Sequence, residues 1–127
     1  MIEALFNQPG YLAAQRMLDA AVVRHEAIAS NIANQETPNY KRLDVAPNFS
    51  AQLNSALASK DAGQLKSLQP RLAVDTSATS PNRDGNTVNI EQELLAMNQN
   101  QIVHTLETQL VTGTLMKLRL AITGRSG

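Results

Sequence analysis

A helical pattern ends within Ser30-Asn31-Ile32-Ala33-Asn34-Gln35-Glu36-Thr37-Pro38-Asn39-Tyr40, and this stop decides how the rest of the chain is arranged. Pro38 cannot continue a helix, and it biases Thr37 away from helical backbone angles. Asn39 tolerates the left-handed backbone region that a sharp turn requires. We therefore expect a helix to end near Gln35 and the chain to turn abruptly into a different kind of segment.

The residues before this stop have the spacing of a helix with one packed face. Between Gly10 and Gln35, apolar and small residues recur at alternating intervals of three and four, as in a coiled-coil seam. These residues are Tyr11, Ala14, Leu18, Ala21, His25, Ile28 and Ile32. A helix of about 25 residues would be about 37 Å long.

A second long helix is expected from Ile90 to about Thr123. Asn89 can cap its first turn, where Glu91 and Glu93 suit the positive end of the helix dipole. Apolar residues cover more than half of its circumference: Leu94, Leu95, Ile102, Val103, Leu106, Leu110, Val111, Leu115, Leu118 and Ile122. Two helices cannot cover that much apolar surface, so the sequence predicts self-association.

Two details refine this helix–helix prediction. Gly113 lowers helix propensity by about 1 kcal/mol relative to Ala, and we interpret it as a mark of close helix contact. The residues expected to form the helix seam are Leu18, Ile28, Ile32, Leu106, Leu110 and Leu118.

The segment between the helices, residues 41–89 and called the insert below, is expected to be largely irregular. Phe49 to Ala58 predicts a short helix, and the chain from Ser59 to Pro81 is polar. Leu72 to Val74 is a candidate strand, and Thr87-Val88 is its candidate partner in a small β-hairpin.

The predicted fold is therefore mainly α, with long N- and C-terminal helices packing as a coiled-coil-like hairpin around an irregular insert. One structural domain is expected, divided into 1–40, 41–89 and 90–127.

Composition and motifs exclude several classes of protein. The 11 basic and 11 acidic residues balance, which argues against nucleic-acid binding and against a polybasic membrane-surface protein. No stretch approaches the roughly 20 apolar residues of a membrane span, so direct membrane insertion is not expected. The N-terminus has an acid, Glu3, where a cleaved signal peptide needs basic residues.

Reaction chemistry is also missing from the sequence. The chain has no cysteine, and its two histidines, His25 and His104, lie in the expected helices without a metal-ligand pattern. No nucleophile elbow or phosphate-binding loop is present. We therefore expect no catalytic residues, no metal and no cofactor.

The helix stop resembles the N-terminal signature of the axial proteins of the bacterial flagellum, which rod, hook and hook-associated proteins share. That signature runs Asn, apolar, Ala, Asn, two variable residues, Thr-Pro, Gly, Tyr. The matching residues are Asn31, Ile32, Ala33, Asn34, Thr37, Pro38 and Tyr40. Asn39 stands where the family usually has Gly, and Asn also tolerates the left-handed region.

A second segment, Asp84 to Glu93, resembles the sequence before the C-terminal helix in proximal rod proteins of the FlgB type. The residues that carry it include Asp84, Gly85, Asn86 and Val88. Asn89 stands where Asp is frequent, and either residue can cap a helix.

This resemblance implies a non-enzymatic subunit of the proximal rod of the flagellar basal body. The implied location is periplasmic, reached through the flagellar type III export apparatus without a cleaved signal peptide. The implied partners are other copies of itself, other rod proteins, the FliE-type basal-body protein and the membrane ring. The alternatives are another short axial component, a cytoplasmic helical adaptor or chaperone of secretion, and an enzyme with a converging polar pocket.

Overall fold

The computed structural model describes residues 6–80 and 82–124, so Glu3 and the boundary residue Pro81 lie outside it. Its elements, in order, are α2 (Pro9–Ala33), β1 (Leu43–Val45), α3 (Asn48–Ala58), α4 (Ala62–Ser67), β2 (Leu72–Val74) and α5 (Ile90–Thr123). The mainly helical fold with two long terminal helices and a small two-stranded sheet is confirmed.

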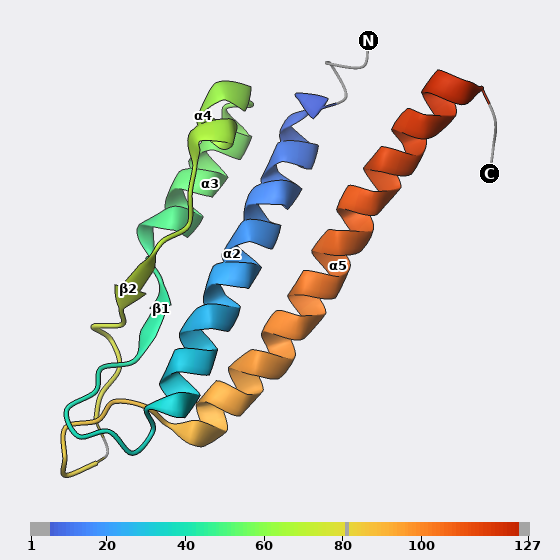
Figure 1. Ribbon diagram of the computed structural model, residues 1–127. Coiled ribbons are helices and arrows are strands. Elements are labelled where there is room, and N and C mark those ends of the chain that lie inside the picture. The colour runs from blue at the N-terminus through green and yellow to red at the C-terminus, as the bar shows by residue number, and fades with distance from the viewer. Residues whose placement is uncertain (1–5, 81, 125–127) are drawn as a thin grey trace.

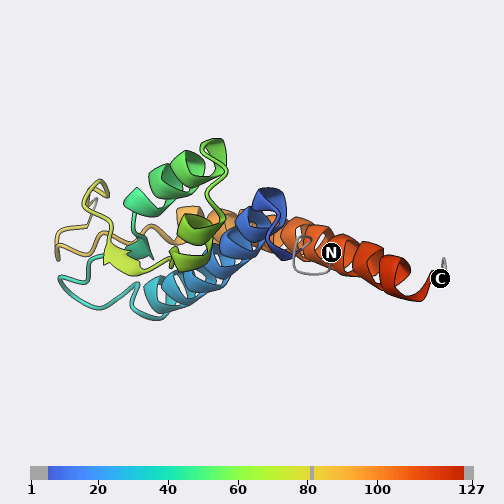
Figure 2. The ribbon, with the colours of Figure 1, turned by 90° about the horizontal axis from the view of Figure 1, so that it is seen from above.

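The two long helices form the expected antiparallel hairpin. α2 and α5 lie side by side near Ala33 and Ile90, and they diverge toward the end that carries both termini (Figures 1 and 2). α2 ends at Ala33, slightly before the expected position, and Asn39 adopts the expected left-handed backbone with φ 62°. Asn89 caps α5 by accepting from the backbone N–H groups of Glu91 and Gln92.

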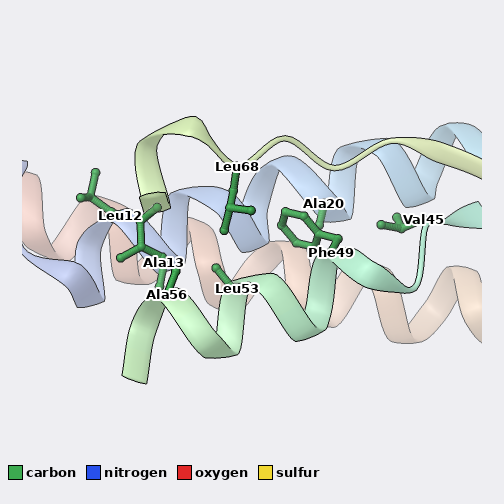
Figure 3. Close-up of a cluster of buried hydrophobic side chains, with 9 residues drawn as sticks. Leu12, Ala13, Ala20, Val45, Phe49, Leu53, Ala56 and Leu68 are labelled. Atoms are coloured by element: carbon green, nitrogen blue, oxygen red, sulfur yellow. The ribbon is translucent and has the colours of Figure 1, made fainter. Parts of the chain in front are cut away.

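The hydrophobic core lies on the side of α2 away from α5, where the insert packs (Figures 1 and 3). α2 contributes small residues, which let α3 and α4 approach closely. The cluster comprises Leu12, Ala13, Ala20, Val45, Phe49, Leu53, Ala56, Leu65 and Leu68. The insert is therefore anchored to α2, and the opposite side of α5 receives no cover from it.

Two expectations for the insert are wrong. Residues 62–67 form a short helix, α4, whose N-cap Asp61 accepts from the N–H of Gln64 at 3.0 Å. β2 does not pair with Thr87-Val88; it pairs antiparallel with β1, in the register Leu43↔Val74 and Val45↔Leu72.

The unpredicted strand pairing has a local cause. The N–H of Thr87 donates to the carbonyl of Tyr40 at 3.0 Å, and the Oγ1 of Thr87 accepts from the N–H of Arg42 at 2.8 Å. Since these bonds hold Thr87 beside residues 40–42, it cannot also pair with β2. The position next to β2 is then taken by Leu43–Val45.

Gly113 makes no close helix contact within the described part of the chain. A Cβ atom built on Gly113 would meet nothing within 4 Å among the described residues. The interpretation of this glycine as a mark of close helix contact stays a prediction.

Candidate assembly interface

The two sequence motifs meet at the base of the helical hairpin, and Asn86 joins them. Its side chain is 0% exposed, and its Nδ2 donates to the carbonyl oxygens of Asn34, Gln35 and Thr37 at 2.9, 3.1 and 2.7 Å. Its Oδ1 accepts from the N–H of Val88 at 2.8 Å. One amide thus binds three carbonyls of the turn that follows α2.

The turn beside Asn86 depends on two residues with left-handed backbone. Gly85 has φ 79°, and the N–H of Asn39 donates to the carbonyl of Asp84 at 2.9 Å. The left-handed backbone favours glycine at position 85, and a Cβ there would also lie 2.6 Å from the Oδ1 of Asn39, which would have to move.

A second amide, Asn31, connects α2 to both β1 and α5. It exchanges two hydrogen bonds with the backbone of Leu43, with its Nδ2 donating at 2.9 Å and its Oδ1 accepting at 2.8 Å. Its Nδ2 also lies 3.2 Å from the Oε2 of Glu93. The hydroxyl of Tyr40 donates to the Oδ1 of Asn31 at 3.3 Å and bonds to Ser30 at 2.8 Å.

Glu93 is 1% exposed, and its charge is balanced by Arg42. The Nε of Arg42 donates to the Oε1 of Glu93 at 2.7 Å, and the Arg42 guanidinium also pairs with Asp75. Hydrogen bonds from Ser77, together with the Arg42 guanidinium, hold the pKa of the Asp75 carboxyl below its ordinary value. The cluster ties α5 to the strands of the insert.

Sequence reasoning missed Arg42, Asp75 and the role of Glu93. The sequence analysis assigns Glu93 only to the first helical turn, as a charge suited to the dipole. The available signal is its spacing of seven residues from Asn100, which Glu91 does not have. Nothing in the local sequence indicated Arg42 or Asp75, because their contacts span 51 and 33 residues.

The remaining motif and seam residues have different environments. Ile32 and Asn34 are half-buried, whereas Ala33, Thr37 and Pro38 are exposed. Among the expected seam residues, Ile28 and Leu118 are buried, and Leu18 and Ile32 are half-buried. Leu106 and Leu110 are 55% and 58% exposed, so they are not part of the contact between α2 and α5.

The face of α5 that α2 covers is largely polar. Its buried residues are Glu93, Asn100, Glu107 and Leu118, and the first three are spaced by seven, so they share one side of the helix. The Nδ2 of Asn100 donates to the carbonyl of Ala21 at 2.8 Å. The Oε2 of Glu107 is buried and finds no hydrogen-bond donor in the described part of the chain.

Replacing Glu107 with Gln is expected to stabilise the isolated protein at pH 7 by about 1 kcal/mol, because a buried and unpaired charge is removed. Burial raises the pKa of the Glu107 carboxyl, so the folded chain binds this proton more readily than the unfolded chain. The cost is therefore absent at low pH and develops as pH rises through the raised pKa. Urea denaturation at pH 7 and pH 4 should show an advantage of Glu107→Gln that shrinks at pH 4. An equal advantage at both pH values would contradict this account.

The opposite side of α5 is uncharged and rich in exposed apolar side chains. From residue 94 to residue 116 the only charged side chain is that of Glu107, which faces inward. The large apolar side chains that remain exposed on α5 are Leu94, Leu95, Met97, Ile102, Val103, Leu106, Leu110, Leu115, Met116, Leu120 and Ile122. A surface of this kind over several helical turns is typical of an interaction site.

In the part of the chain that the structure describes, no helix has the length and apolar character to cross a membrane. Residues 6–80 and 82–124 contain no group of three or more His, Asp and Glu side chains placed to hold a metal ion.

These features define the class of protein. A helical hairpin whose C-terminal helix turns its polar residues toward α2 and leaves apolar residues exposed is a subunit suited to helical assembly. No family model matches the chain.

Curated relatives then identify the family. The chain is 32% identical over 115 residues to the flagellar basal body rod protein FlgB of Borrelia hermsii, covering 76% of this chain and 83% of the relative. It is 30% identical to FlgB of Borreliella burgdorferi, covering 75% and 82%, and 30% identical to FlgB of Aquifex aeolicus, covering 81% and 84%. The chain belongs to the FlgB family of flagellar basal body rod proteins.

Proposed function

We propose that this protein is a structural subunit of the proximal rod of the flagellar basal body, and that it transmits torque as part of a helical tube. The observation that carries the proposal is the uncharged apolar face of α5, which the chain itself leaves exposed. Contacts that repeat head to tail produce a helical tube when the rotation between copies does not close a ring. The role is mechanical, with no reaction catalysed.

The parts of the chain are proposed to divide this work. Residues 1–40 and 90–127 form the assembling unit, and the insert lies beside it on α2. Of the expected seam residues, Leu106 and Leu110 are the ones exposed for contacts between subunits. The motif at the helix stop stabilises the closed end of the hairpin, where Asn31 bonds the backbone of β1 and Tyr40 bonds Asn31.

The proposed partners are those of a rod that starts at the membrane ring. They are other copies of this chain, other rod proteins, the FliE-type basal-body protein and the membrane ring. The proposed route is the flagellar export apparatus, without a cleaved signal peptide, and the proposed location is the periplasmic rod.

Replacing Leu110 with Asp should abolish assembly and motility, because a charge buried without a partner in a subunit contact costs on the order of 3 kcal/mol at every copy. The isolated subunit should keep its stability, since Leu110 is 58% exposed. The variant is tested by complementation of cells that lack the gene, with swimming assays and isolation of basal bodies.

Leu57→Asp is the matched control, because Leu57 is an exposed leucine of α3 on the other side of the molecule. This variant should swim normally. Normal motility of Leu110→Asp would contradict the proposed assembly surface. If the unmutated protein stays in the cytoplasm and is missing from basal bodies, the result would instead favour a secretion adaptor.

A further inference from the structure

Gly113 is a helical glycine that neither the backbone nor the packing of this chain explains. The glycines with positive φ are Gly85 and Gly124, so the backbone at Gly113 is one that any residue adopts. The space where its Cβ would lie is open among the described residues. Alanine at this position would favour the helix and would clash with none of the described residues.

The position of Gly113 on α5 suggests a purpose. It lies seven residues from both Leu106 and Leu120, so the three share one side of the helix. With Leu95 and Ile102 they form a line that we call the outer stripe: Leu95, Ile102, Leu106, Gly113 and Leu120. The four large residues of this stripe are exposed. A glycine between leucines leaves a hole in the ridge, into which a side chain of a second helix can fit.

The chemistry of the stripe limits what can fill this hole. Since residues 94–116 carry no outward charge, a charged helix would lose hydration there without gaining an ion pair. α2 carries Arg16, Asp19, Arg24 and Glu26 along its length. The stretch of this chain that is long enough and uncharged enough to pack on the outer stripe is α5 itself. Its leucine side chains are large enough to fill the space over Gly113.

We propose that α5 of a second copy of this chain crosses α5 at Gly113, with an apolar side chain of that copy seated directly over the glycine backbone. This inference rests on the proposed function, in which the apolar face of α5 is an assembly surface. It adds the point at which the helices cross and the identity of the partner helix, which is α5 of a second copy.

The first test uses the opposite effects that the proposal predicts for the monomer and for the assembly. Gly113→Leu should raise the melting temperature of the isolated subunit by about 4 °C through helix propensity alone. It should also fill the hole and reduce the number of assembled basal bodies by on the order of tenfold, the factor that about 1.4 kcal/mol of lost contact produces. Gly113→Ala should show the same signs with smaller effects.

Gly10→Ala is the matched control, because Gly10 is also helical and its Cβ would also meet open space. It should leave assembly unchanged. If Gly113→Leu assembles normally while Leu110→Asp does not, the crossing at Gly113 is wrong and the proposed function stands. If both assemble normally, the proposed function fails as well.

The second test identifies the occupant. Because the chain has no cysteine, Gly113→Cys can be mixed with Leu106→Cys or Leu120→Cys and oxidised in assembled basal bodies. A disulfide-linked product of twice the subunit mass is expected, and Thr108→Cys, on another side of α5, should give none. Rods that assemble without this product, or a link to a different protein, would overturn the proposal.

Discussion

Replacing Asn86 with Ala is expected to lower the free energy of unfolding by about 3 kcal/mol, because four hydrogen bonds around a buried amide are lost together. The carbonyls of Asn34, Gln35 and Thr37 lose the bond from the amide, although Asn34 and Thr37 each keep a backbone donor. The N–H of the buried Val88 loses its acceptor. Chemical denaturation of the purified protein measures the loss.

Asn86→Asp separates the two ends of the amide. It keeps the acceptor for Val88 but removes the donor and places negative charge against three carbonyls, so it should be at least as harmful as Asn86→Ala. Asn54, an exposed residue of α3, supplies the control, and Asn54→Ala should change stability by less than about 0.5 kcal/mol. A loss below about 1 kcal/mol for Asn86→Ala would show that water replaces the amide.

Replacing Glu93 with Ala should cost a similar amount, about 3 kcal/mol, because it leaves the Arg42 guanidinium with less compensation in a mostly buried site. We expect the lower end of the range for a broken buried pair, since Arg42 keeps Asp75 and Asp44 as partners. Asn31 also loses an acceptor. Thermal and urea unfolding check the value.

The exposed neighbour Glu91 provides the control in the same helical turn, and Glu91→Ala should change stability by only a few tenths of a kcal/mol. Glu93→Gln keeps the shape and removes the charge, so it separates the ion pair from the hydrogen bonds. In a double-mutant cycle, Arg42→Ala should cost much less when Glu93 is already Ala. Additive losses would mean that the two side chains do not interact in solution.

The hairpin itself could be predicted from the sequence because its signals are local. The seam of α2, the stop at Pro38 and the cap at Asn89 each depend on residues within a few positions of one another. Asn39 illustrates how far this reaches: its tolerance of left-handed backbone predicted a turn, and its φ is 62°. These features can be predicted because each depends on neighbouring residues and not on contacts between distant parts of the chain.

The junction between the motifs could not be predicted in the same way. Asn86 contacts Asn34 across 52 residues, and Arg42 contacts Glu93 across 51. The β1–β2 pairing was missed for the same reason, because Leu43–Val45 is too short to show a strand pattern by itself. α4 was missed because six residues cannot show helical periodicity, although Asp61 offered a cap.

The two sides of α5 show where periodicity misleads. Its apolar residues surround most of the helix. The sequence therefore indicates more apolar surface than α2 can cover, but it does not indicate which side of α5 stays exposed. The structure places Glu93, Asn100 and Glu107 inward. Glu93 bonds the side chain of Asn31 and Asn100 bonds the backbone of α2, whereas the Oε2 of Glu107 finds no donor among the described residues. Leu106 and Leu110 then remain on the outside, where they are 55% and 58% exposed.

The clamp at the base of the hairpin has a consequence for how this chain can change in evolution. Asn39 is bonded to Asp84, and Tyr40 and Arg42 are bonded to Thr87, so the segment that enters the insert and the segment that leaves it are fastened to each other. The chain between about residue 43 and residue 83 leaves and returns through this fastening, and the segment from Val45 to Leu68 also packs on α2. We therefore expect changes in the length of the insert to be tolerated at its exposed turns, where they disturb neither the fastening nor the core.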